Sequence, residues 1–223
     1  MTDMRSALTR LGAAVAVAAL LTSCSGGNDD GGAEEPKGLT AAEVCGGFAK
    51  DPASTAALKA AMSSERFRDN LSASEKALDL LRDATRAPLA DSYRPQPVKY
   101  CWLLAEETGK DSLAIELSPT QRAPGLHPDH AKVVTSYTSG LQAFSSSTLG
   151  HVYFSCRLKA PAHTIVVDTT VRGPVPFPET DLEQRTRLIT VANAAARQVS
   201  AELGCEDDGL ATGVPSPTAN PTS

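Results

Sequence analysis

The sequence predicts an α+β domain, in which helices pack on one face of an antiparallel sheet made of two hairpins. Three observations predict this class. Apolar and polar residues alternate in paired segments between residues 98 and 172, which is typical of strand hairpins. Helix-start signals come before residue 90, and an apolar stripe with helical spacing fills residues 181–203. Hairpins with helices at both ends favour helices segregated to one face of the sheet.

Three helix starts are expected in the N-terminal part of the domain. Thr40–Glu43 is a capping box, which predicts a short helix. Asp51 followed by Pro52 is an N-cap with proline at the first helical position, and it predicts a helix through about residue 62. A second capping box, Ser72–Glu75, predicts a helix that ends near residue 86, before a proline.

The strand signals follow. Residues 98–105 and 113–117 predict the first hairpin, around a polar turn at 106–110, and residues 151–172 predict the second. Residues 133–138 are rich in β-branched side chains and predict a further strand, although the same region also fits one face of a helix.

A third capping box, Thr180–Glu183, opens the long C-terminal helix, and Gly204 is a natural residue to end it. The inward stripe consists of Leu182, Ile189, Ala192, Ala196, Val199 and Leu203. Residues 206–223 are acidic at first and then rich in Gly, Pro, Ser and Thr, which predicts a disordered tail. A single folded domain is therefore expected over residues 39–205.

The N-terminal segment, residues 1–23, is typical of a lipoprotein signal peptide. Arg5 and Arg10 precede the apolar run at residues 11–21, which is too short to span a bilayer. Leu21-Thr22-Ser23-Cys24 resembles a bacterial lipobox, which implies cleavage after residue 23 and attachment of a diacylglyceryl group to the Cys24 thiol. Two acyl chains anchor a protein stably to a membrane surface. We therefore expect the mature chain on the extracytoplasmic face of the cell membrane, joined to its anchor by a flexible tether over residues 24–38.

Four further cysteines lie in the predicted domain: Cys45, Cys101, Cys156 and Cys205. An even number in an exported domain predicts two disulfides, for which three connectivities exist. We favour Cys45–Cys101 with Cys156–Cys205, because each pair would tie a helix to a strand that is its neighbour along the chain. Cys101–Cys156 with Cys45–Cys205 is the main alternative.

Charge and motifs argue against several function classes. The 223 residues contain 21 Lys and Arg against 26 Asp and Glu, which gives a net charge of −5. Without a basic excess, and with only 4% aromatic residues, nucleic-acid binding is not expected. The sequence has no Gly-x-Ser-x-Gly elbow, no phosphate loop and no Cys-x-x-Cys pair, so it predicts no cofactor, no metal and no recognised catalytic residue.

Several polar and aromatic residues are candidates for a site, and each also has a structural interpretation. Asp168 interrupts an apolar strand, and we favour a place on the outer face of that strand over a place in a pocket. Trp102 is the only tryptophan, and we favour core packing beside a disulfide over ligand binding. Solvated positions are expected for the acidic turn residues and for the histidines: Glu106, Glu107, Asp111, His127, His130, His151 and His163.

Several features together resemble small actinobacterial lipoproteins of unknown function: the lipobox, the acidic linker, Cys45 in an early helix, Tyr100-Cys101-Trp102 at the start of a hairpin, and a final helix ending in Leu203-Gly204-Cys205. The cysteine arrangement is also similar to the extracytoplasmic sensor domains of some mycobacterial serine/threonine kinases, which carry paired disulfides. Both resemblances imply an exported α+β domain and bring no known chemistry.

We therefore expect a membrane-anchored lipoprotein whose domain binds a small ligand, a wall component or a protein partner, rather than an enzyme. The alternative is an extracytoplasmic hydrolase or transferase with an unrecognised site. A pocket that held Asp168 together with a histidine would favour the alternative. A pocket lined by leucine and valine would favour an apolar ligand.

Overall fold

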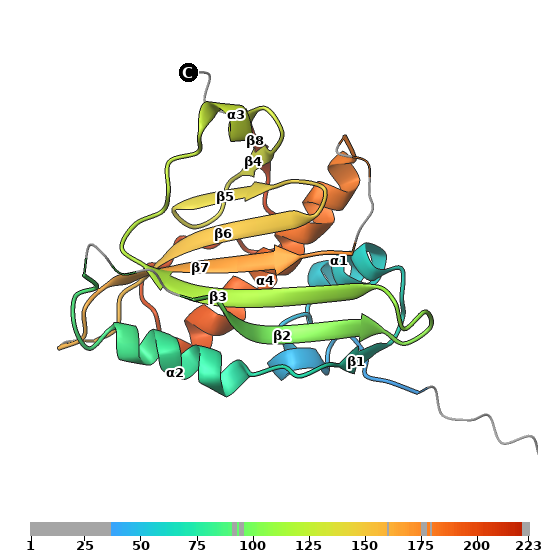
Figure 1. Cartoon of the computed structure of the whole chain (residues 1–223), viewed down its shortest axis with the longest axis horizontal. Coiled ribbons are helices and arrows are strands. Elements are labelled where there is room, and N and C mark those ends of the chain that lie inside the picture. Colours follow the sequence, from blue (N-terminus) through green and yellow to red (C-terminus); the bar gives the residue numbers. More distant parts are fainter. Residues whose placement is uncertain are drawn as a thin grey trace, which may run out of the picture. The chain divides into compact units, whose positions relative to one another are not determined.

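The computed structural model describes residues 37–90, 93, 96–159, 161–174, 178 and 180–219. Their strands form one eight-stranded sheet with the order β1-β2-β3-β7-β6-β5-β4-β8, in which all neighbouring pairs are antiparallel (Figure 1). Residues 1–36 lie outside the described residues, and with them the predicted signal peptide, Cys24 and nearly all of the predicted tether.

Both predicted hairpins are confirmed. β2 (Val98–Ala105) pairs with β3 (Ser112–Thr120), and β6 (Leu149–Cys156) pairs with β7 (Ile165–Arg172). β3 also pairs with β7, so the two hairpins form one continuous sheet.

Short strands extend the sheet on both sides. β1 (Phe67–Asp69) pairs with β2. On the other side, β5 (Gln142–Ser145) pairs with β6, β4 (Thr135–Tyr137) with β5, and β8 (Pro217–Thr218) with β4. A short helix, α3 (Pro128–Ala131), precedes β4. The predicted strand at 133–138 is confirmed as β4, whereas β1, β5 and β8 are too short for their alternation to be recognised.

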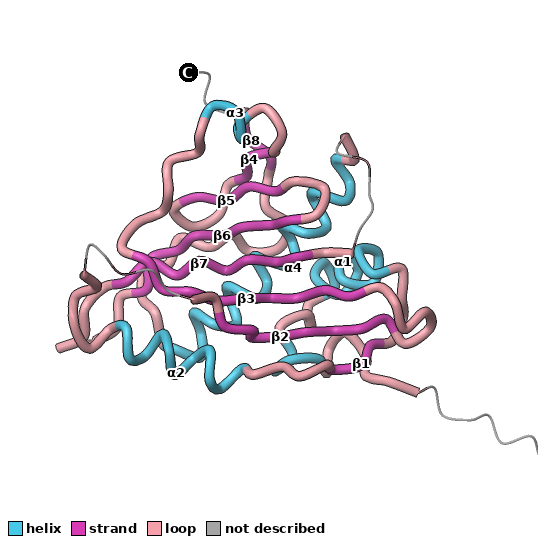
Figure 2. Tube along the Cα trace, viewed as in Figure 1, coloured by secondary structure: helices cyan, strands magenta, loops and turns pink. Residues whose placement is uncertain are grey.

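The long helices lie on one side of the sheet. α4 (Leu182–Leu203) and α2 (Ser74–Ala84) pack against the strands, and α1 (Pro52–Met62) packs against α4 (Figures 1 and 2). The cap of α4 is Asp181 and not Thr180, so the predicted capping box is wrong by one residue: the Asp181 carboxylate accepts a hydrogen bond from the Gln184 N–H at 2.9 Å. No helix in the described part of the chain is long and apolar enough to cross a membrane.

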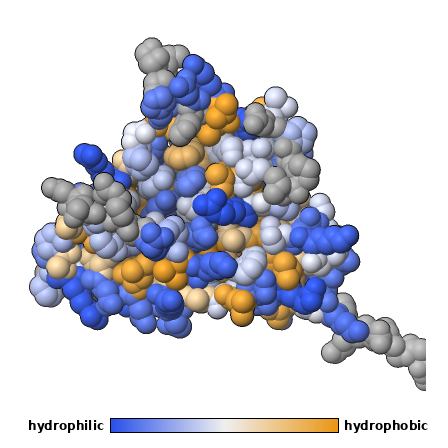
Figure 3. Space-filling view, viewed as in Figure 1, coloured by the Kyte–Doolittle hydropathy of each residue, from blue (hydrophilic) through white to orange (hydrophobic). Residues whose placement is uncertain are grey.

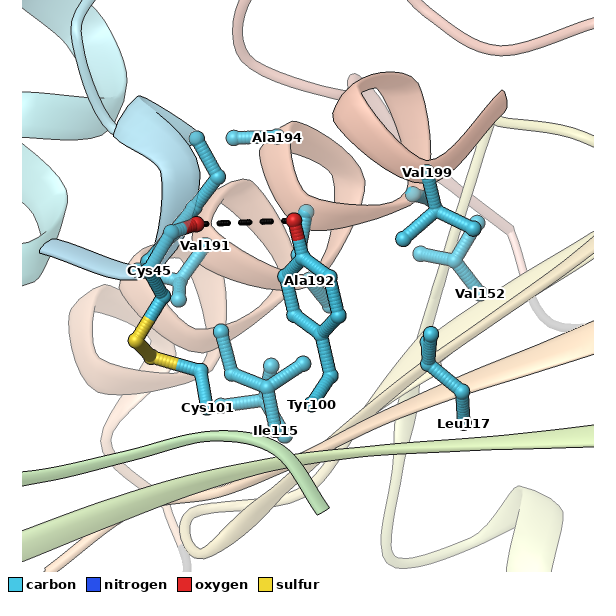
Figure 4. Packing of buried hydrophobic residues seen from close by; sticks show 14 of the residues in the cluster. Cys45, Tyr100, Cys101, Ile115, Leu117, Val152, Val191, Ala192, Ala194 and Val199 are labelled. Atoms are coloured by element: carbon cyan, nitrogen blue, oxygen red, sulfur yellow. Dashed lines mark hydrogen bonds between the residues drawn. A yellow bond between two sulfur atoms is a disulfide. The ribbon is translucent and has the colours of Figure 1, made fainter. Parts of the chain in front are cut away.

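The middle of α4 is buried on all sides because the helix lies between the sheet and α1. The predicted stripe covers only part of this buried surface. Leu188, Val191 and Ala195 are buried as well, whereas Leu182, which the stripe included, is 62% exposed at the helix start. Figure 4 shows Val191, Ala192 and Ala194 of α4 within the packed core.

A β-bulge in β2 decides which side chains reach this core. The register between β2 and β3 shifts between Lys99 and Cys101, so Tyr100 and Cys101 both point inward and are fully buried. The Tyr100 hydroxyl donates to the Cys45 carbonyl at 3.4 Å (Figure 4). Burial raises the pKa of this hydroxyl, so Tyr100 stays protonated. The bulge also turns Trp102 away from the core, so the prediction of Trp102 as a core residue is wrong.

The favoured disulfide pairing is confirmed. Cys45–Cys101 joins the 3-10 turn η1 (Val44–Gly47) to β2, with the two Cα atoms 5.6 Å apart. Cys156–Cys205 joins the end of β6 to the residue that follows the C-cap of α4, with a Cα separation of 4.7 Å. Each disulfide therefore holds the helical side of the domain to the sheet.

Two N-terminal predictions need correction. Glu43 accepts hydrogen bonds from the Thr40 N–H and hydroxyl at 2.8 Å, as a capping box requires, but only η1 follows. The helix stops because Cys45 and Gly46 have φ values of 44° and 75°. Ser72 does not cap α2, because its hydroxyl accepts the Trp102 N–H of β2 at 2.9 Å.

The predicted disordered tail is wrong for residues 206–219, which we call the C-terminal strap. The buried Asn193 amide of α4 donates to the Ala211 carbonyl at 2.9 Å and to the Gly213 carbonyl at 3.1 Å. Its oxygen accepts a hydrogen bond from the Ser139 hydroxyl at 2.5 Å. Composition could not show this order, because the bonds come from side chains far away along the chain. Residues 220–223 lie outside the described residues.

Candidate functional site

The face of the sheet opposite α4 is the candidate site, and we call it the uncovered face. The described helices α1, α2 and α4 lie on the other side, and Figure 3 shows hydrophilic and hydrophobic residues interspersed over the strands in the same view as Figure 1. Strand register brings side chains from five strands into two neighbouring rows. The first row is Lys99, Glu116, Thr170, His151 and Phe144, and the second is Ser118, Asp168, Tyr153 and Gln142.

Asp168 lies at the centre of a hydrogen-bonded cluster on this face. Its Oδ1 lies 3.3 Å from His151 Nδ1 and accepts a hydrogen bond from the Thr170 hydroxyl at 3.2 Å. The Thr170 oxygen is itself 3.1 Å from His151 Nδ1. The His151 and Asp168 side chains are only 19% and 18% exposed, so the cluster is held in a partly desolvated place.

The Tyr153 phenol belongs to the same cluster. Burial, followed by the charge and hydrogen bonding of Asp168, raises the pKa of Tyr153, so the phenol stays neutral. A neutral phenol donates its proton to the carboxylate. Asp168 thus has three partners in place, which fixes its orientation.

Three rings stack beside the cluster. The Phe144 ring lies 5.0 Å from the His151 ring, centroid to centroid, with an interplanar angle of 26°. The His151 and Tyr153 rings are nearly parallel, at 4° and 6.0 Å. Such pairs add stabilisation beyond the burial of their area, so the imidazole is held from one side by Asp168 and Thr170 and along its faces by the rings.

A hollow of about 370 Å³ opens next to Phe144 and His151. We call it the β5–β6 hollow, because most of its lining comes from that hairpin. The lining residues are Val133, Val134, Phe144, Ser146, Leu149 and His151. The volume lies within the range of small-molecule sites, and an apolar wall with a few polar groups is their usual construction.

No protein-family model, curated protein or solved structure matches this chain.

The structure brings some of the predicted residues together. Asp168 lies on the outer face of its strand, as favoured, and does not line the hollow. His151 is not a solvated end of the hairpin: it lies within β6, bonded to the carboxylate that a catalytic or positioning histidine needs. Phe144, Tyr153 and Thr170 were missed. The signal for the last two was the two-residue spacing from His151 and Asp168, which places them on the same face of their strands.

The acidic turn is exposed at Glu107, as expected, and it also has a structural role. Glu106 forms an ion pair with Arg68 at 2.7 Å. Glu107 accepts hydrogen bonds from the Ser64 hydroxyl and from the Glu65 N–H, and the Ser64 bond is the main cause that lowers the pKa of Glu107. These contacts tie the β2–β3 turn to the segment after α1.

The remaining candidates are peripheral. Trp102 lies outside the core, with the Lys99 ammonium 3.7 Å from the centre of its ring. His127 and His163 are exposed, as expected, and the side chain of His130 lies outside the described residues. Asp111 accepts a hydrogen bond from the Thr108 hydroxyl at 3.3 Å, within the turn. Among the side chains that the structure describes, no group of three or more His, Cys, Asp or Glu is placed to hold a metal ion.

Proposed function

We propose that the mature chain is a membrane-anchored extracytoplasmic lipoprotein whose domain binds a small ligand on the uncovered face. The lipobox-like Leu21–Cys24 segment supports the anchor, and a diacylglyceryl group on Cys24 is the proposed contact with the membrane. The two disulfides support an oxidising compartment, because such bonds rarely persist in the cytosol.

One observation carries the binding function: an apolar hollow lies beside a histidine that is already oriented by Asp168, Thr170 and its ring neighbours. Preformed polar groups in an apolar site lower the entropy that is lost when a ligand binds. The disulfides and the packed helices on the opposite face make the sheet a rigid platform for such a site.

The alternative, an extracytoplasmic hydrolase or transferase, is favoured by the His151–Asp168 pair, which has the arrangement of a general base and its orienting carboxylate. It requires a nucleophile or a bound water at Nε2. Within the described residues, the only hydroxyl bonded to His151 is that of Thr170, and it contacts Nδ1, on the side of Asp168. Binding is therefore the function that we propose first.

A fragment screen tests the binding function. Chemically diverse small molecules are screened by ligand-observed NMR against the full mature chain in lipid nanodiscs, with empty nanodiscs as the blank. Val133 lines the hollow and is 48% exposed, so Val133→Trp should fill the hollow without disturbing the core. Val214 is 51% exposed and does not line the hollow, so Val214→Trp is the matched control.

We expect several fragments to bind the wild type and the Val214→Trp variant and to lose at least tenfold in affinity for the Val133→Trp variant. If fragments bind all three proteins equally, the hollow is not the binding site. If the wild type releases a product from ester or amide fragments, and His151→Gln abolishes that release, the hydrolase alternative is correct.

A further inference from the structure

We infer that the β5–β6 hollow takes a small apolar monocarboxylic acid, an inference that rests on the proposed binding function and names its ligand class. Two polar side chains line the hollow, Ser146 and His151. Their hydrogen-bonding capacity is partly used within the protein, and the unused part defines the group that a ligand must present.

Ser146 can only donate into the hollow. Its hydroxyl oxygen accepts hydrogen bonds from the backbone N–H groups of Thr148 at 3.3 Å and Leu149 at 3.1 Å. A hydroxyl oxygen has two acceptor positions and one proton. Both acceptor positions are occupied, and no acceptor for its O–H is found among the described residues. The ligand group next to Ser146 must therefore be an acceptor.

Nε2 is the ring nitrogen of His151 that its partners within the protein leave for a ligand. The single Thr170 hydroxyl proton is donated to Asp168 Oδ1, so the contacts of His151 Nδ1 with Asp168 and Thr170 require a proton on Nδ1. Nε2 has no partner among the described residues. It accepts a hydrogen bond when the ring is neutral and donates one when the ring is an imidazolium.

A carboxyl group suits His151 because a single proton, on the ligand oxygen or on Nε2, makes the hydrogen bond between them. The Asp168 carboxylate lies 3.3 Å from Nδ1 and holds the ring in place for this bond. Asp168 itself does not line the hollow, so its charge does not face the ligand directly. Ser146 then donates to one oxygen of the ligand and His151 Nε2 shares a proton with the other, which is the arrangement that suits the two oxygens of a carboxyl group.

The rest of the lining sets the body of the ligand. Val133, Val134 and Leu149 are aliphatic and Phe144 supplies a ring, so the part of the ligand away from its carboxylate must be apolar. The volume of about 370 Å³ limits the ligand to a small molecule. The competing class is a primary amide, whose carbonyl accepts from Ser146 and whose NH₂ donates to a neutral His151.

Three probes with one skeleton separate these classes: 3-phenylpropanoate, 3-phenylpropanamide and 3-phenylpropylamine. Their affinities are measured by titration calorimetry at neutral pH on the full mature chain in nanodiscs, with empty nanodiscs as the blank. We expect the carboxylate to bind about tenfold more tightly than the amide, because charge-assisted hydrogen bonds are roughly twice as strong as neutral ones. The amine should bind most weakly.

Two histidine variants then test the role of His151. His151→Gln should remove the tenfold preference for the carboxylate, whereas His163→Gln, which changes an exposed histidine away from the hollow, should retain it. Circular dichroism verifies that both variants are folded, so that a loss of preference is not a loss of structure.

The outcomes distinguish this inference from the proposed function. If the amide or the amine binds as tightly as the carboxylate, and Val133→Trp blocks that binding, the hollow is a site but the ligand class is wrong. If none of the three probes binds while other fragments do, the ligand class is again wrong and the binding function stands. If the carboxylate preference persists in His151→Gln, the inferred role of His151 is overturned.

Discussion

At the scale of single residues, side chains with distant partners decide both the site and the order of the chain around it. Asp168 joins His151, Thr170 and Tyr153 on the uncovered face. Asn193, on the opposite side of the sheet, bonds to two carbonyls of the C-terminal strap and holds it against α4. In both cases one polar group satisfies several partners, so its loss leaves more than one buried atom without a hydrogen bond.

Asn193→Ala should therefore release the C-terminal strap and lower the free energy of unfolding by about 2–4 kcal/mol, because the Ser139 hydroxyl and two backbone carbonyls lose their partner. Urea unfolding followed by circular dichroism measures this loss. Gln198→Ala, on the exposed part of the same helix, is the control and should change the free energy by no more than about 0.5 kcal/mol. If Asn193→Ala and Gln198→Ala change the free energy of unfolding equally, the Asn193 amide does not hold the C-terminal strap.

Glu107 makes the stability depend on pH. Its hydrogen bonds with Ser64 and the neighbouring backbone lower the pKa of Glu107 in the folded chain below the ordinary value of 4.5. Because the pKa of Glu107 is lower in the folded chain than in the unfolded chain, this stabilisation is fully present above pH 4.5. It is lost as the pH falls through the pKa of the folded chain. The melting temperature of Glu107→Gln should be lower than that of the wild type at pH 6 and approach it at pH 3. A difference that is independent of pH would contradict this role.

At the scale of elements, α4 acts as the central support of the domain, because the sheet and α1 pack on its two sides. Ile189→Asp should lower the free energy of unfolding of the purified chain by about 3 kcal/mol or more, because it places an unpaired charge in the core. Leu182→Asp, on the same helix at a residue that is 62% exposed, is the matched control and should leave the melting temperature nearly unchanged. If Ile189→Asp melts like the wild type, the buried surface of α4 is not part of the folding core.

The elements also show what the sequence could and could not predict. The cap at Asp51 led to α1, and periodicity led to α4 and both hairpins, because those signals are local. The order of helices and strands along the chain then led to the disulfide pairing. The bulge at Tyr100, the failed cap at Ser72 and the ordered strap depend on contacts made across the sheet, which no local pattern contains. The candidate site was predicted only in part. Asp168 and His151 stood out as residue types, but their pairing depends on the register of β6 with β7.

At the scale of the whole molecule, two disulfides hold the helices to the sheet, and we propose that acyl chains on Cys24 display this domain on a membrane. The disulfides join the helical side to the sheet near both ends of the domain's chain, at Cys45 and Cys205. The proposed anchor depends on the single cysteine that lies outside this framework, Cys24. These two uses of cysteine can be measured together.

Intact-mass spectrometry of the native protein, purified from membranes and alkylated under denaturing but non-reducing conditions, tests the proposed lipid anchor and the two disulfides in one measurement. We predict a chain that begins at Cys24, carries a diacylglyceryl group and gains no alkyl group at Cys45, Cys101, Cys156 or Cys205. A Cys24→Ser variant, expressed in the same cells, should lack the lipid mass. A wild-type chain without the lipid would contradict the proposed anchor at Cys24. A chain with two or more added alkyl groups would contradict the two disulfides.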